Sequence, residues 1–191
     1  MSLDSVLQLQ TLNKMMRGQF EIAPARSVMI LGIAGGNGLE HLPAGKFQKV
    51  YGVDVDSAYL KEVWCRYPHL DGVLECLCLD LTKEAGALPH ADLLLADLLV
   101  EYIGCACFQQ AVKKVSPRFV SCIIQLNTGR EWVSASPYLH VFDRLNEVHH
   151  DMDEASLQEA VQAVGYRHVR TLRRPLPNGK QLVQQDFEKT P

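Results

Sequence analysis

Short apolar runs alternate with helical stripes along most of this chain, and this alternation constrains the fold more than any other feature. Continuous apolar runs are typical of strands that are buried on both faces, whereas apolar residues spaced by three and four are typical of helices packed on one face. Strands joined through helices pair in parallel, because the crossover connection is right-handed. The expected strands are residues 28–31, 49–53, 73–79, 91–96 and 118–126.

The end of the chain has a different pattern. Residues 166–173 and 181–187 form two extended runs, and they are joined through Asn178-Gly179, a dipeptide typical of tight hairpins. A hairpin adds an antiparallel strand to a sheet that is otherwise parallel. We therefore expect an α/β fold with a Rossmann-like, doubly wound, seven-stranded sheet, mostly parallel with an antiparallel C-terminal hairpin strand.

Length and composition indicate one folded domain over residues 1–191, with 47% hydrophobic and 21% charged residues. Residues 1–24 are expected to form an N-terminal helical cap, and the aperiodic segment 127–152 a lid or a substrate-side insert. The net charge of −3 argues against general nucleic-acid binding, which needs a basic surface. The absence of a long apolar run and of a signal-peptide pattern predicts a cytoplasmic protein without a membrane partner.

Six cysteines are present, and the sequence offers no secretion signal to accompany them. We therefore expect free, buried thiols rather than disulfides. The two Cys-x-Cys pairs are spaced too closely for the usual structural zinc pattern, so no metal site is expected. The cysteines are at positions 65, 76, 78, 105, 107 and 122.

A glycine-rich turn follows the first expected strand, with four glycines among residues 32–38. Glycine lets the backbone approach a ligand without an intervening Cβ. The turn leads into a helix N-terminus, whose N–H groups favour a phosphate or a carboxylate. A tight strand-to-helix connection is the simpler explanation of such a turn, but the acids that follow the next strands favour a ligand site.

Acidic residues follow the next three strands where each strand ends. Asp54 is placed to accept the hydroxyls of a ribose, which leaves Asp56 to cap the following helix. The pair Asp80-Leu81 suits an adenine, and it equally suits another helix cap. Asp97 is expected to face the centre of the cleft. In an open parallel sheet, ligands bind beyond the carboxyl ends of the strands, so these positions should share one site.

With these residues in place, the chain resembles the class I S-adenosylmethionine-dependent methyltransferases over about residues 27–188. The glycine loop of that family is matched by residues 30–38, its ribose acid by Asp54, its adenine pair by Asp80-Leu81 and its fourth-strand motif by residues 91–97. The resemblance implies S-adenosylmethionine as cofactor and in-line methyl transfer to a small-molecule acceptor. The cofactor-binding residues that it implies are Gly32, Ile33, Ala34, Gly36, Asn37, Gly38, Asp54, Val55, Asp80, Leu81, Asp97 and Leu98.

Two positions depart from the family pattern. Gly32 stands where the family usually has an acid that helps to hold the methionine amine, and Ala34 stands where it usually has glycine. Alanine favours negative φ, so we expect a loop of different shape, with Asp97 or a backbone carbonyl taking the amine. These departures keep open a non-catalytic module that binds the cofactor. An NAD-dependent oxidoreductase is a weaker alternative, because His41 interrupts the G-x-G-x-x-G register and the terminal hairpin does not fit that fold.

The sequence identifies no catalytic residue, but it offers candidates on the acceptor side. A histidine pair near neutral pKa suits a general base, although solvated turn residues are the simpler interpretation. Glu101 is expected to interact with a helix dipole rather than to act as an acid. The acceptor-side candidates are Tyr102, Asn127, Trp132, His149 and His150.

Four arginines lie at positions 167, 170, 173 and 174. On a regular strand, 167 and 173 point one way while 170 and 174 point the other. We therefore expect a charged sheet edge that blocks pairing with other chains, not a nucleic-acid patch. The apolar stripe within residues 4–20 indicates core packing, and the expected assembly is a monomer or a homodimer.

Overall fold

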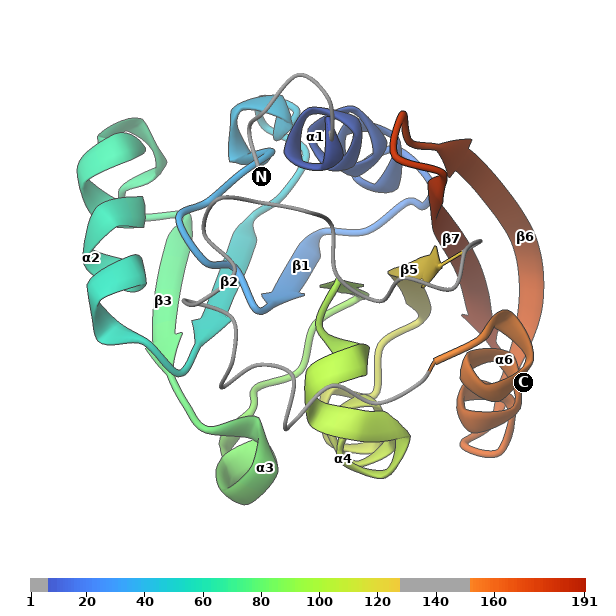
Figure 1. Cartoon of the computed structure of the whole chain (residues 1–191). Coiled ribbons are helices and arrows are strands. Elements are labelled where there is room, and N and C mark those ends of the chain that lie inside the picture. Colours follow the sequence, from blue (N-terminus) through green and yellow to red (C-terminus); the bar gives the residue numbers. More distant parts are fainter. Residues whose placement is uncertain (1–6, 128–151) are drawn as a thin grey trace.

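A computed structural model describes residues 7–127 and 152–191 of the chain. Seven strands form one sheet in the order β3-β2-β1-β4-β5-β7-β6, with helices on both faces (Figure 1). The strands are β1 (Ser27–Leu31), β2 (Lys49–Asp54), β3 (Leu74–Cys78), β4 (Leu93–Asp97), β5 (Phe119–Asn127), β6 (Tyr166–Pro175) and β7 (Lys180–Lys189). The helices are α1 (Gln8–Gln19), α2 (Ser57–Arg66), α3 (Leu81–Glu84), α4 (Val100–Val115) and α6 (Glu154–Gln162), with single 3₁₀ turns at Leu39–His41, Pro68–Leu70 and Ala85–Ala87.

Strand directions follow the expectation. Strands β1 to β5 pair in parallel, while β7 is antiparallel to both of its neighbours, β5 and β6. The carboxyl ends of β1 to β5 therefore meet at one edge of the sheet, here called the carboxyl edge. The expected mixed α/β sheet with a C-terminal hairpin is confirmed.

The two central strands are buried on both faces, which explains their continuous apolar sequences. Residues 93–96 of β4 are fully inaccessible to solvent, and residues 28–31 of β1 are almost so. One apolar cluster packs α4 and α6 against the lower face of the sheet in Figure 1, and a second packs α1 and α2 against the upper face. Leaving these side chains in water would cost about 25 cal/mol for each Å² of apolar surface.

Helix α1 begins at Gln8, within the stretch 4–20 that carries the apolar stripe. The residue before the helix is Leu7, at a left-handed φ of 48° and without a side-chain cap, and residues 1–6 lie outside the described part of the chain. The apolar stripe itself is confirmed at Leu12 and Met16, which are buried, although Leu9 is exposed.

Strand β6 contains a bulge that overturns the expected arrangement of its arginines. The register with β7 shifts between His168 and Arg170, so one extra residue lies on β6. Arg167 consequently pairs with Glu188 and Arg170 with Asp186, two β7 residues that share a face. Arg173 contacts α6 on the opposite face. The prediction that 167 and 173 point the same way is wrong, because it assumed an unbroken strand.

All six cysteines are free, as expected, but they are not all buried. Cys122 is buried, whereas Cys65 and Cys78 are exposed. In the described part of the chain, no cluster of three histidine, cysteine or acidic side chains could hold a metal ion. No helix in that same part is long and apolar enough to cross a bilayer.

Candidate functional site

The glycine-rich loop leaves β1 and is anchored on the neighbouring strand β2. The backbone N–H groups of Gly32 and Ile33 both donate to the carbonyl oxygen of Val53, over 2.8 and 3.1 Å. The hydroxyl of Tyr67, at the end of α2, donates to the carbonyl oxygen of Gly36. The loop is therefore held from both sides at the carboxyl edge, with its backbone at the ends of β1 and β2.

Ala34 adopts the backbone conformation that we expected it to avoid. Its φ is 47°, in the left-handed region, where an L-residue is strained by about 1–2 kcal/mol. Its N–H donates to Oδ2 of Asp54 over 2.9 Å, and this hydrogen bond helps to hold the strained residue in place. The loop thus keeps a left-handed turn at this position in spite of the alanine.

Asp54 lies at the end of β2, directly against the loop. Besides the bond from Ala34, it accepts the N–H of Asp56 through Oδ1, over 2.9 Å. Asp56 in turn caps α2 by accepting the N–H of Ala58, as expected. Val55, between the two acids, is 68% exposed. The structure therefore brings the glycine loop and the expected ribose acid together at one place.

Asp80 stands at the end of β3 and caps α3. Its carboxylate accepts the N–H and the hydroxyl of Thr82 and the ammonium of Lys83, which lies 2.7 Å away. The hydrogen bond from Lys83, followed by those from Thr82, lowers the pKa of Asp80 to about 2. Leu81 is buried in the apolar cluster that packs α4 and α6 against the sheet. Because the N–H of Leu79 donates to the carbonyl oxygen of Asp54, the ends of β2 and β3 remain adjacent.

Asp97 ends β4 with its carboxyl group beneath α1. Oδ1 accepts a hydrogen bond from Nε2 of Gln19 over 2.8 Å, while the buried Oδ2 has no partner among the described residues. Burial raises the pKa of Asp97 to about 7. Leu98, the next residue, has a left-handed φ of 53° and donates its N–H to the carbonyl oxygen of Ile123.

Glu101 is a further acid at the carboxyl edge, where only an interaction with a helix dipole was expected from the sequence. It lies in the first turn of α4 and is 2% exposed. Its Oε1 accepts the backbone N–H of Gln125, near the end of β5, over 2.8 Å, and its buried Oε2 has no partner in the described structure. Burial raises its pKa to about 7. The signal in the sequence was an acid four residues after Asp97 in an otherwise apolar turn.

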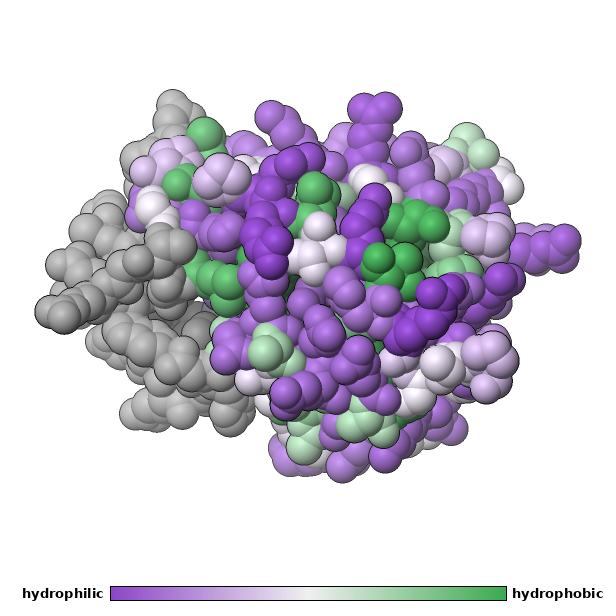
Figure 2. Space-filling model, turned by 90° about the vertical axis from the view of Figure 1, so that its right-hand side faces the viewer, coloured by the Kyte–Doolittle hydropathy of each residue, from purple (hydrophilic) through white to green (hydrophobic). Residues whose placement is uncertain are grey.

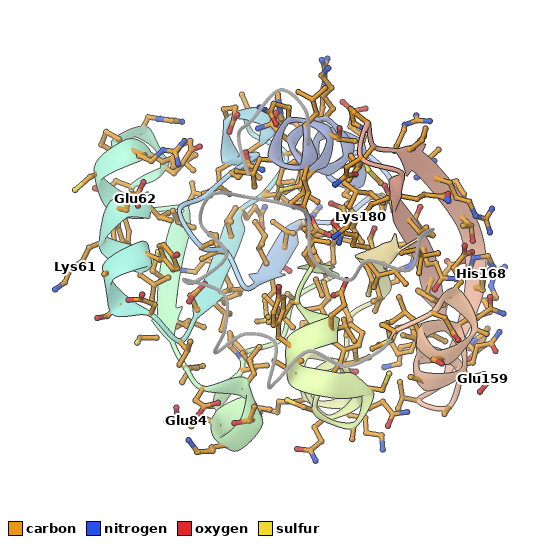
Figure 3. The ribbon with its side chains drawn as sticks, in the orientation of Figure 1. Lys61, Glu62, Glu84, Glu159, His168 and Lys180 are labelled. Atoms are coloured by element: carbon orange, nitrogen blue, oxygen red, sulfur yellow. The ribbon has the colours of Figure 1, made fainter. Side chains whose placement is uncertain are left out.

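Two more residues, Tyr102 and Lys180, lie near the carboxyl edge. Tyr102 follows Glu101 and is partly buried, which raises the pKa of its phenol. Lys180 begins β7 in register with Asn127 at the end of β5, and Figure 3 shows it beside that end. Burial lowers the pKa of Lys180. The other acceptor-side candidates, Trp132, His149 and His150, lie outside the described residues.

Comparison with known proteins gives matches in structure alone. No family model matches the chain, and no curated protein matches it in sequence. The methyltransferase domain of bacterial CtHen1-C aligns at 17% identity with a TM-score of 0.66, over 96% of this chain and 97% of that one. The N-methyltransferase NodS from Bradyrhizobium japonicum aligns at 12% identity with a TM-score of 0.67, over 95% and 96%. The chain has the class I methyltransferase fold.

Within this methyltransferase fold, the solved structures cover varied chemistry. A geranyl diphosphate methyltransferase in complex with S-adenosylmethionine aligns at 9% identity with a TM-score of 0.70, over 94% of this chain and 85% of that one. The [4+2]-cyclase SpnF aligns at 10% identity with a TM-score of 0.69, over 94% and 80%. The fold alone therefore does not identify the reaction, which has to be inferred from the residues of the site.

Proposed function

We propose that this protein binds S-adenosylmethionine at the carboxyl edge and transfers its methyl group to a small-molecule acceptor. The observation that carries the proposal is the hydrogen bond from the Ala34 N–H to Asp54, which joins the glycine loop to an acid at the end of the next strand. A carboxylate in that position suits the two hydroxyls of a ribose. The cofactor-bound geranyl diphosphate methyltransferase of the same fold supports this choice of ligand.

The residues present fit such a cofactor. Asp54 would hold the ribose, and the backbone of residues 32–38 would pass close to the methionine part, since glycine leaves room for a ligand. The bound cofactor supplies an electrophilic methyl group. We assign Glu101 to the acceptor side, because its Oε2 has no hydrogen-bond partner among the described residues and a nucleophilic N–H or O–H group would satisfy it. A carboxyl group with a pKa of about 7 suits proton transfer at neutral pH.

A module that binds the cofactor without turnover is the second candidate. Gly32 supports it, because this position offers no side chain to hold the methionine amine. Both candidates predict binding of S-adenosylmethionine, and they differ only in release of the demethylated product.

Calorimetric titration tests the binding step. We expect S-adenosylmethionine and its demethylated product to bind, and NAD not to bind. Asp54→Ala should weaken cofactor binding about 10- to 100-fold, since it removes hydrogen bonds to a charged group. Asp56→Ala is the matched control, because it removes the neighbouring helix cap and should leave the affinity unchanged. Equal losses in both variants would overturn the assignment of Asp54.

A methyl-transfer assay over a panel of small amines, phenols and carboxylic acids tests turnover. The readout is release of the demethylated cofactor. Turnover that falls in Glu101→Gln while cofactor affinity is kept supports methyl transfer with Glu101 at the acceptor. Tight cofactor binding without product release across the panel favours the non-catalytic module.

A further inference from the structure

A groove of about 480 Å³ runs between α1 and β6, on the upper face of the sheet. One stripe of α1, which includes Met15 and Gly18, forms one wall, and alternate residues of β6, which include Leu172, form the other. The volume is within the range of small-molecule sites. Figure 2 shows this side of the molecule, where small hydrophobic patches lie among hydrophilic residues.

The walls of the groove carry three cations, Lys14, Arg170 and Arg174, against one exposed acid, Glu21. Arg170 is fixed by Asp186, which accepts from two of its guanidinium nitrogens over 2.8 and 2.7 Å. Its side chain is nevertheless 50% exposed, so further N–H donors remain available. Lys14 and Arg174 form no ion pair with any residue in ranges 7–127 and 152–191.

The direction of α1 orders these charges along the groove. Gln8, at the start of α1, bonds to Gln125 near the carboxyl end of β5, whereas Gln19, at its end, bonds to Ser121 further back on the same strand. The N-terminal half of α1 therefore lies toward the carboxyl edge of the sheet, and the C-terminal half lies away from it.

Two of the three cations, Lys14 and Arg174, lie nearer to the carboxyl edge than Glu21 does. Lys14 lies at the middle of α1, as the seventh of its twelve residues, and Arg174 is the residue before Pro175, where β6 ends. Glu21 follows the far end of α1. The side chains of Met15 and Leu172 provide apolar surface along the groove.

We propose that this groove binds a small ligand whose anionic group, a carboxylate or a phosphate, pairs with Lys14 and Arg174 while its apolar part packs on Met15 and Leu172. Guanidinium and ammonium groups form their strongest hydrogen bonds with such anions. This groove lies on the outer side of α1, on residues that the proposed cofactor site does not use. The proposal of an anion site therefore does not depend on the proposal of methyl transfer.

Direct binding of simple probes tests the proposal. Phenyl phosphate, benzoate and the neutral benzyl alcohol are titrated at constant ionic strength and followed by NMR chemical-shift changes. We expect one or both anions to bind and to shift the amides of α1 and β6, and benzyl alcohol to bind at least about 10-fold more weakly. The tighter of the two anions identifies the ligand class. No binding by either anion, or equal binding by benzyl alcohol, overturns the proposal.

Substitutions of residues that line the groove test whether the anion binds there. A Cβ added at Gly18 meets nothing within 4 Å, so there is open space at this position for a side chain, and Gly18→Leu should occupy the groove and abolish anion binding. Gly86→Leu is the matched control, because that glycine also has open space around it but lies on another part of the surface. Lys14→Gln and Arg174→Gln should each weaken anion binding at least about five-fold.

Lys113→Gln, on α4 at the other face of the sheet, is the charge control and should leave binding unchanged. Gly18→Leu should keep or raise Tm, since leucine is the better helix former, so loss of binding would not reflect unfolding. Anion binding that survives Gly18→Leu, or that falls equally in Lys113→Gln, overturns the groove as the site.

Discussion

Gly38 and Met16 lie so close together that a Cβ on Gly38 would be 2.6 Å from Sδ of Met16 and 3.0 Å from its Cβ. The glycine loop thus packs directly against α1. Asn13 of the same helix adds a hydrogen bond from its Nδ2 to Oδ1 of Asn37, over 3.1 Å. Helix α1 therefore helps to fix the shape of the loop.

Gly38→Ala is expected to destabilise the protein more than Gly45→Ala. Both glycines have positive φ, 91° and 72°, so both variants incur the strain of a left-handed alanine. Only Gly38 has a neighbour that the new methyl group would strike, and such overpacking costs about 1–3 kcal/mol. Urea denaturation measures the difference, and Met16→Ala should recover part of it in the double variant. Equal losses in the two single variants would contradict the packing argument.

Ala34→Gly is expected to raise the free energy of unfolding by about 1 kcal/mol, because glycine tolerates the left-handed φ of 47° without strain. Ala58→Gly, in the first turn of α2, should act in the opposite direction, since glycine weakens a helix by about 1 kcal/mol. Thermal and urea denaturation of the two variants measure whether each substitution raises or lowers the free energy of unfolding. A destabilised Ala34→Gly would show that the strain is absent.

Asp186→Ala is expected to destabilise the fold by about 3 kcal/mol, because a buried acceptor of several donors is lost. Its carboxylate accepts from Ser121, Gln184 and Arg170, and its side chain is only 8% exposed. Glu188→Ala removes a more exposed acid, 24% accessible, from the same strand and should cost less than about 1 kcal/mol. Urea denaturation measures the loss of stability in each of the two variants. Similar losses would argue against a stabilising hydrogen-bond network around Asp186.

Stability is expected to fall as pH rises from about 4 to about 7. The pKa values of Asp97 and Glu101 are both raised to about 7, from ordinary values of 3.8 and 4.5. Between those limits the folded protein keeps protons that the unfolded chain has released, so each carboxyl lowers the free energy of unfolding by up to about 1.4 kcal/mol per pH unit. Below the ordinary values this contribution is complete, and above pH 7 it is lost.

Urea denaturation at intervals between pH 4 and pH 8 measures this slope. Asp97→Asn and Glu101→Gln keep the shape of each side chain but remove its titration, so each should flatten the pH dependence. A slope that is unchanged in the double variant would show that these carboxyl groups titrate normally.

Local sequence patterns were sufficient for the sheet, the glycine loop and the helix cap at Asp56. Each depends on residues a few positions apart: apolar runs for the strands, glycines for the loop, and an acid accepting the N–H of the residue two positions later for the cap. The Asn178-Gly179 turn also has its expected place between β6 and β7.

Burial and strand register, by contrast, were decided only by the tertiary structure. Glu101 of α4 is buried where its carboxylate accepts the N–H of Gln125 from strand β5, and Asp97 is covered because Gln19 of α1 lies over it. One bulge in β6 moved Arg167 to the face of Arg170. The sequence by itself determined which segments form strands, helices and turns, since these follow from neighbouring residues. The tertiary structure decided which charges are buried or paired, because each of those outcomes depends on groups distant in the chain.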